Sequence, residues 1–113
     1  MRSALLILLF ASALATGVPA QGERALARPR ARIDAVDARI VGLLNERARI
    51  VREIGQIKRQ AGLPAADPTR VDEVLNRIAS QSTGPLPEEH LRRIYRQIVA
   101  EMTAFEAAEM TRK

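Results

Sequence analysis

Apolar residues recur with a helical period over most of the chain. Between Arg30 and about Gln60 they fall three or four positions apart rather than at every second position, which is typical of an amphipathic helix. A helix of about 30 residues would be about 45 Å long. A single chain of this size cannot cover it, so we expect a second chain to pack against it. The apolar positions are Ile33, Val36, Ile40, Leu43, Leu44, Ile50, Val51, Ile54 and Ile57.

Two further helical segments follow, each bounded by turn residues. Gly62 and Pro64 end the first helix. Asp67 then supplies an N-cap before Pro68, which predicts a short helix over residues 68–80 with its apolar positions turned inward. Residues 81–85 form a turn, and a third helix begins at residues 87–89, where acidic side chains suit the helix dipole. The pattern predicts an all-α fold with three helices per chain, in the order long, short, long.

The first 20 residues have the pattern of a signal peptide. A short positive segment containing Arg2 precedes an uncharged apolar run over residues 4–17, and Val18 and Ala20 stand where a signal peptidase reads small side chains. The run is shorter than the roughly 18 apolar residues of a membrane anchor, although an uncleaved anchor is the alternative. We expect export to the periplasm or beyond the cell, without stable membrane association after cleavage. Residues 21–29 are polar, contain Pro29, and are expected to form a flexible arm.

Composition narrows the possible chemistry. With 113 residues the chain holds one small domain, and it has no cysteine and a single histidine, His90. Disulfides and thiol chemistry are excluded, and a zinc or haem site is disfavoured. The net charge of +5 suits nucleic acid, a membrane surface or a small anion. Export and the 3% content of aromatic residues argue against nucleic acid, which leaves a membrane surface or a small anionic ligand.

Two cations interrupt the apolar face of the first helix. Arg47 lies between apolar neighbours, and Lys58 follows it by eleven residues. The two side chains therefore point within about 20° of each other and lie roughly 16 Å apart along the axis. They could converge on one anion. Alternatively, Arg47 reaches the surface or pairs with a carboxylate such as Glu46 or Glu53, and the spacing does not decide between these possibilities.

Two further charged residues have both a functional and an ordinary interpretation. Glu106 continues the apolar stripe of the third helix, and an unpaired carboxyl in an apolar interior favours its protonated, hydrogen-bond-donating form; the alternative is a frayed last turn. Arg30 precedes Arg47 by 17 residues, about 260° of rotation and 25 Å of rise. It can serve a pocket of a partner chain whose long helix runs antiparallel, or it is an ordinary surface arginine.

The ordered set of charged residues resembles the class of chorismate mutases called AroQ. The first helix of that family begins with an arginine and an I-D-x-[IVL]-D phrase, continues with L-[LI]-x-x-R, and closes with I-[GA]-x-x-K. Here Arg30, Arg47 and Lys58 fall at those three basic positions. Asp67 and Arg70 fall where the family has an acid and an arginine at the start of its second helix. Residues 95–106 are similar to its third-helix phrase, so the domain is expected over residues 30–110.

The resemblance implies an intertwined helical homodimer that binds chorismate, a small dicarboxylate, and rearranges it to prephenate without metal or cofactor. Arg47 and, from the partner chain, Arg30 would bind the carboxylates. Lys58 and a protonated Glu106 would face the ether oxygen. Asp67, Arg70, Val71 and Met102 would complete the substrate-binding site.

Three positions depart from the family pattern. Glu106 replaces a common glutamine, which predicts activity that falls as the pH rises and the carboxyl ionises. Met102 stands where serine is common. Val71 follows Arg70 where a glutamate usually contacts the substrate hydroxyl, and an apolar residue there is similar to isochorismate–pyruvate lyases of the same fold. That lyase activity and a non-catalytic periplasmic interaction protein are the two alternatives to chorismate mutase.

Overall fold

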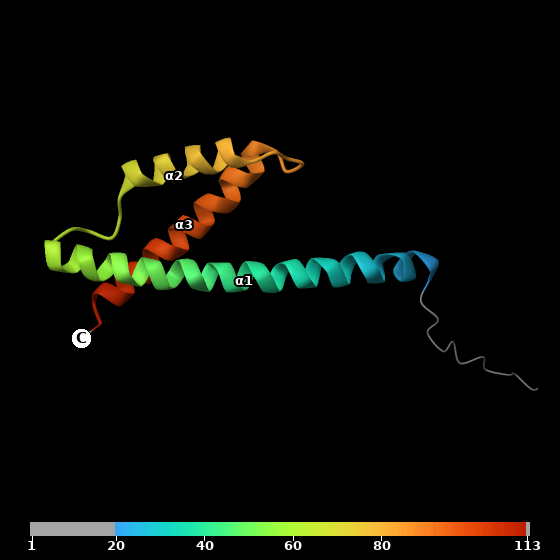
Figure 1. Ribbon diagram of the computed structural model, residues 1–113. Helices are drawn as coiled ribbons and strands as arrows, with labels where there is room; N and C mark the ends of the chain where they lie inside the picture. The colour runs from blue at the N-terminus through green and yellow to red at the C-terminus, as the bar shows by residue number, and fades with distance from the viewer. Residues whose placement is uncertain (1–19, 113) are drawn as a thin grey trace, which may run out of the picture. The chain divides into compact units, whose positions relative to one another are not determined.

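The computed structural model describes residues 20–112 and consists of three helices (Figure 1). They are α1 (Gln21–Ala61), α2 (Pro68–Gln81) and α3 (Glu88–Met110). This confirms the all-α fold with a long, a short and a long helix. Residues 1–19 of the expected signal peptide lie outside the described residues. Over residues 20–112, none of the helices combines the length and the apolar character needed to cross a bilayer.

The first helix begins earlier than the sequence pattern indicated. We expected an irregular arm over residues 21–29, but the backbone is helical from Gln21 and Pro29 lies inside the helix. Proline inside a helix removes one hydrogen bond and crowds the carbonyl of the preceding turn. This cost is opposed by the high helix propensity of Ala25, Leu26 and Ala27 and by the favourable place of Glu23 in the first turn. The expected start of the first helix at Arg30 was therefore wrong, since the helix begins at Gln21.

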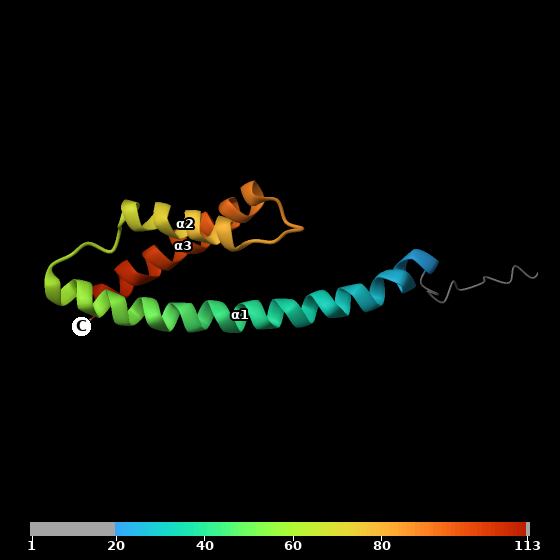
Figure 2. The same cartoon turned by 45° about the horizontal axis from the view of Figure 1, so that its top comes forward.

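By its contacts the chain divides into two units, the first ending at Asp37 and the second beginning at Ala38. The second unit contains the rest of α1 together with α2 and α3. Within it, α2 packs against α3 (Figure 2). The most buried apolar side chains are Val51 of α1 and Val74 and Leu75 of α2. This small core lies among the three helices, and a polar cavity is built beside it.

The C-terminal turns of α3 are fixed to α1 by polar contacts. Arg52 Nε lies 3.2 Å from Glu109 Oε2, and the same guanidinium stacks 5.8 Å from the centre of the Phe105 ring. Arg59 donates a hydrogen bond of 2.9 Å to the carbonyl of Arg112. These contacts explain why Glu106 lies in a regular helix and is only 6% exposed, so the alternative of a frayed last turn is wrong.

Much of the apolar stripe of α1 remains uncovered in the single chain. Within the second unit, the exposed fraction is 63% for Leu43, 50% for Ile50 and 64% for Ile57. Exposed apolar side chains in such continuity are characteristic of an interaction surface rather than of a monomer's exterior. The other large apolar side chains exposed along α1 are Leu26, Ile33, Val36, Ile40, Val41 and Ile54.

Candidate active site

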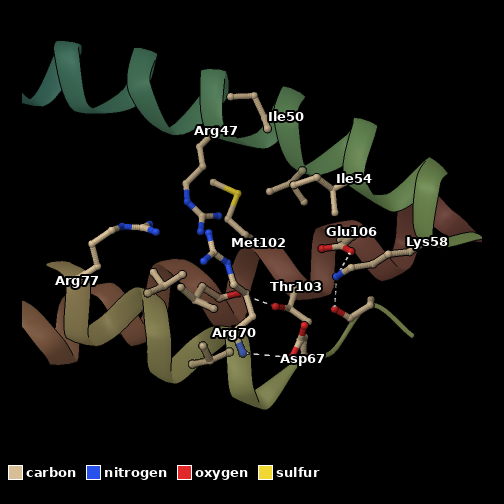
Figure 3. Close-up of a pocket in the computed structure, with 15 residues that line it drawn as sticks. Arg47, Ile50, Ile54, Lys58, Asp67, Arg70, Arg77, Met102, Thr103 and Glu106 are labelled. Atoms are coloured by element: carbon tan, nitrogen blue, oxygen red, sulfur yellow. Dashed lines mark hydrogen bonds and ion pairs between the residues drawn. The ribbon is translucent and has the colours of Figure 1, made fainter. Parts of the chain in front are cut away.

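A cavity of about 320 Å³ opens among the three helices of the second unit (Figure 3). This volume is in the range of small-molecule sites. Its wall combines apolar side chains with charged ones. The lining residues are Arg47, Ile50, Val51, Ile54 and Lys58 of α1, Ala65 and Asp67 of the connecting loop, Arg70, Val71, Val74 and Arg77 of α2, and Val99, Met102, Thr103 and Glu106 of α3.

Seven of the eight site residues expected from the sequence line this one cavity, and the eighth, Arg30, does not. Arg30 is exposed and belongs to the first unit. Arg47 and Lys58 face the same cavity because their spacing places them on one face of α1. A single chain thus brings together every expected residue except the one that the sequence assigned to a partner chain.

Lys58 and Glu106 form an ion pair that is largely shielded from solvent. Lys58 Nζ lies 2.7 Å from Glu106 Oε1, and the two side chains are 19% and 8% exposed. The ammonium also donates a hydrogen bond of 2.8 Å to the carbonyl of Ala65. The ion pair is close but lacks hydrogen-bond alignment, so Glu106 Oε1 is a buried oxygen with no hydrogen-bond partner among the described residues. The ammonium of Lys58 balances the charge of this carboxylate.

Arg47 projects from α1 into the cavity, where its guanidinium lies opposite that of Arg70 (Figure 3). Arg47 has no ion pair with any residue between 20 and 112, and Arg70 pairs only with the exposed Glu73, at 3.3 Å. The alternative in which Arg47 pairs with Glu46 or Glu53 is therefore not realised. Two facing guanidinium groups repel each other unless an anion lies between them.

The start of α2 shapes the other side of the cavity. Asp67 caps the helix, since its Oδ1 accepts a hydrogen bond of 3.1 Å from the backbone N–H of Arg70. This cap fixes the direction in which Arg70 and Val71 leave the backbone. Val71 and Met102 add half-buried apolar surface. The hydroxyl of Thr103 donates to the carbonyl of Val99 at 2.8 Å, so its hydrogen is already engaged.

Gly55 allows α3 to approach α1 closely beside the ion pair. It is buried, and a Cβ atom at this position would lie 3.2 Å from Glu106 Cγ and 3.3 Å from Met110 Cγ. These distances are shorter than ordinary carbon contacts of about 3.5–4.0 Å. The absent side chain is therefore part of what places the Glu106 carboxyl next to Lys58.

Gly55→Ala is expected to be less stable than Gly42→Ala by about 1–3 kcal/mol, because overpacking has a cost of that size. Gly42 is the matched control, since it is also helical and nothing lies within 4 Å of a Cβ there. Alanine at that site should stabilise α1 by about 0.5–1 kcal/mol. Urea unfolding of both variants at the same protein concentration measures the difference. Equal free energies of unfolding would show that the helices are not in close contact at Gly55.

Eight of the fifteen lining residues were not among the expected site residues, and three of these eight contribute polar groups. Arg77 follows Arg70 by two helical turns, so the same arithmetic that paired Arg47 with Lys58 would have found it. Thr103 neighbours Met102 on a helix whose inward face was recognised. Ala65 contributes through its backbone carbonyl, and no side-chain pattern indicates the direction of a carbonyl group in a loop.

Comparison with known proteins agrees with this geometry. Residues 29–107 match the family described as chorismate mutase type II. The chain is 38% identical over 81 residues to a bifunctional chorismate mutase/prephenate dehydratase of Aquifex aeolicus (strain VF5), covering 68% of this chain and 22% of that protein. It is 38% identical over 53 residues to a chorismate mutase of Methanocaldococcus jannaschii, covering 47% and 54% respectively.

Among solved structures, the chorismate mutase of Thermus thermophilus (form II) superposes with a TM-score of 0.70 at 34% identity. The match covers 73% of this chain and 93% of that one. The chain spans only about a fifth of the length of the bifunctional relatives that it matches. The family match nevertheless includes the whole of α2, most of α1 and α3, and the whole lining of the cavity. The chain belongs to the chorismate mutase type II family.

Proposed function

We propose that this chain is a chorismate mutase, an isomerase that converts chorismate to prephenate. The observation that carries the proposal is the pair of facing guanidinium groups of Arg47 and Arg70 in a cavity with the Lys58–Glu106 pair. A small molecule with carboxylates and an ether oxygen matches this arrangement. The family match over residues 29–107 supports the same activity.

The rearrangement breaks one C–O bond and forms one C–C bond within the substrate. All electrons move inside one molecule, so the protein forms no bond to it and its residues act by holding and by electrostatics. Arg47 binds a carboxylate through a charge-assisted fork and holds the folded conformer. Arg70, Val71 and Met102 shape the hydroxyl end of the site, and Asp67 orders it by capping α2.

Lys58 is placed to stabilise the charge that develops on the ether oxygen as the C–O bond breaks. Its ammonium has three N–H donors. One donates to the carbonyl of Ala65 and the group is held against Glu106, so a further donor is free for a ligand. A donor that is already oriented costs little reorganisation during the reaction. Glu106, when protonated, donates to the same oxygen from its buried carboxyl.

The Glu106→Gln variant is expected to have a kcat that varies less with pH than that of the parent. An ionised Glu106 cannot donate a hydrogen bond and offsets the charge of Lys58, whereas the amide of glutamine donates at every pH. The measurement is kcat across the acidic, neutral and alkaline range for both proteins, with exposed Glu101→Gln as the matched control. A variant whose kcat falls with rising pH as steeply as that of the parent would contradict the donor role of Glu106.

A direct assay tests the proposed reaction. Loss of chorismate with an equal amount of prephenate supports it. Pyruvate release from isochorismate would instead favour a lyase, the alternative suggested by the apolar Val71 in the cavity wall. Absence of both reactions, with the chain folded and dimeric, would leave a helical interaction protein.

We further propose that the working form is a homodimer in which Arg30 reaches the cavity of the partner chain. Two features support this arrangement. The apolar stripe of α1 is uncovered in the single chain, and Arg30 precedes Arg47 by 17 residues on the same helix, a rise of about 25 Å. A second copy that packs along α1 would cover that stripe and add a cation to each site.

We also propose export, on the basis of the N-terminal sequence pattern alone. The mature chain would then begin at Gln21, which is also the first residue of α1. Mass determination of the protein recovered from the periplasm tests this cleavage site.

A further inference from the structure

Arg77 lines the cavity but has no role in the proposed rearrangement chemistry. It lies on α2 seven residues after Arg70, a rotation of about 700°, so the two side chains leave the helix within about 20° of each other. Their Cα atoms are separated by about 10 Å along the axis. Arg77 thus extends the row of cations on the cavity face of α2.

The guanidinium of Arg77 lies at the end of the cavity opposite Lys58, with Arg47 and Arg70 between them (Figure 3). It has no ion pair with any residue from 20 to 112. The two carboxylates of the lining are engaged elsewhere: Asp67 caps α2 and Glu106 pairs with Lys58. No acidic side chain of the cavity therefore neutralises this end.

The net charge of the lining residues indicates the charge of the ligand that the cavity would bind. Four cationic side chains and, with Glu106 ionised in its pair with Lys58, two carboxylates line the cavity. This chain alone therefore supplies two net positive charges, before the cation that the partner's Arg30 would add. Without Arg77 only one would remain from this chain. Guanidinium forks match carboxylates in shape as well as charge. Because a carboxylate has about four acceptor positions, the unpaired Arg77 can bind a carboxylate that Arg47 or the partner's Arg30 also binds.

We propose that Arg77 is a specificity residue that contacts the substrate carboxylate at the end of the cavity remote from Lys58. The proposal rests on the proposed function only in taking the ligand to be a dicarboxylate. Arg77 is far from the bond that breaks, so its contact is equally strong in the bound substrate and in the transition state. Such uniform binding changes KM and leaves kcat unaltered.

Arg77→Gln is expected to raise KM for chorismate about three- to fivefold, the effect of a partly solvated ion pair, with kcat unchanged within about twofold. Arg77→Lys should give a smaller rise, since it keeps the charge but loses the fork. Arg93→Gln is the matched control: it removes the same charge from a position of α3 that is not in the lining. Calorimetric titration with prephenate measures dicarboxylate binding independently of turnover.

A selective rise in KM and in the Kd of prephenate for Arg77→Gln, absent in Arg93→Gln, supports the proposal. Equal effects in both variants, or none, overturn it. If the parent binds prephenate but does not convert chorismate, the proposed function fails, while weaker binding by the Arg77 variants still supports the contact. A parent that binds no prephenate overturns both. Circular dichroism shows whether each variant is folded. If Arg77→Gln is unfolded, the KM and the Kd of prephenate for Arg77→Lys test the proposal instead.

Discussion

Lys58→Ala is expected to lower kcat roughly 100- to 1,000-fold, the usual consequence of removing one preorganised donor from a developing oxyanion. The ammonium is the cation held by both a carbonyl, that of Ala65, and a buried carboxylate, that of Glu106. Its position is therefore fixed before the ligand enters. Because the charge on the ether oxygen develops only as the bond breaks, the loss should affect kcat more than KM. Steady-state kinetics with chorismate measures both constants.

The same substitution removes the partner of a buried carboxyl, and this second effect must be separated from the first. An unpaired charge in a buried site destabilises a protein by about 3–5 kcal/mol, so Lys58→Ala alone could lose activity through unfolding. The double variant Lys58→Ala/Glu106→Gln removes both charges and should recover much of the stability. We expect its kcat to remain low, because no cation faces the ether oxygen. Arg93→Ala is the control for charge, since its exposed side chain lies outside the cavity lining.

A kcat for Lys58→Ala within about tenfold of the parent would contradict the role of this cation. A double variant that regained both stability and rate would contradict it as well, since the loss in the single variant would then come only from the unpaired Glu106. Urea unfolding of each protein at the concentration used for kinetics distinguishes these results.

The helical frame of this protein could be predicted because its sequence has a clear period and clear helix boundaries. Asp67 and Pro68 mark the start of α2 by their chemistry, and the structure begins that helix at Pro68. Arg47 and Lys58 were placed on one face by arithmetic alone, and both line the cavity. The rotation per residue of a helix is constant, so spacing within one element translates directly into shared direction.

Contacts between different helices were harder to predict from the sequence. The pairing of Glu106 with Lys58 depends on how closely α3 approaches α1 at Gly55, and no periodicity within either helix contains that information. The hydrogen bond from Lys58 to the carbonyl of Ala65 depends on the path of the loop between α1 and α2. The early start at Gln21 shows a different limit, because Pro29 suggested a boundary that the neighbouring helix-favouring residues override.

Arg30→Ala is expected to lose roughly 10- to 100-fold in kcat/KM, as suits the loss of a charge-assisted hydrogen bond to a carboxylate. An experiment that mixes two variant chains is more informative. If Arg30 acts in the partner's cavity, equimolar Arg30→Ala and Lys58→Ala chains that are unfolded and refolded together should recover about a quarter of the parent's activity. About half of the dimers would be mixed, and one of the two cavities in each would contain every parental group.

The matched control is an equimolar mixture of Arg47→Ala and Lys58→Ala chains. Both residues line the cavity of their own chain, so every cavity in the mixed dimer lacks one of them and no recovery is expected. Recovery in the first mixture but not in the second therefore identifies Arg30 as the group supplied in trans. If neither mixture recovered, although mass measurement showed mixed dimers, Arg30 would have to act within its own chain or not at all. The exposed stripe of α1 would then join two chains without completing either site.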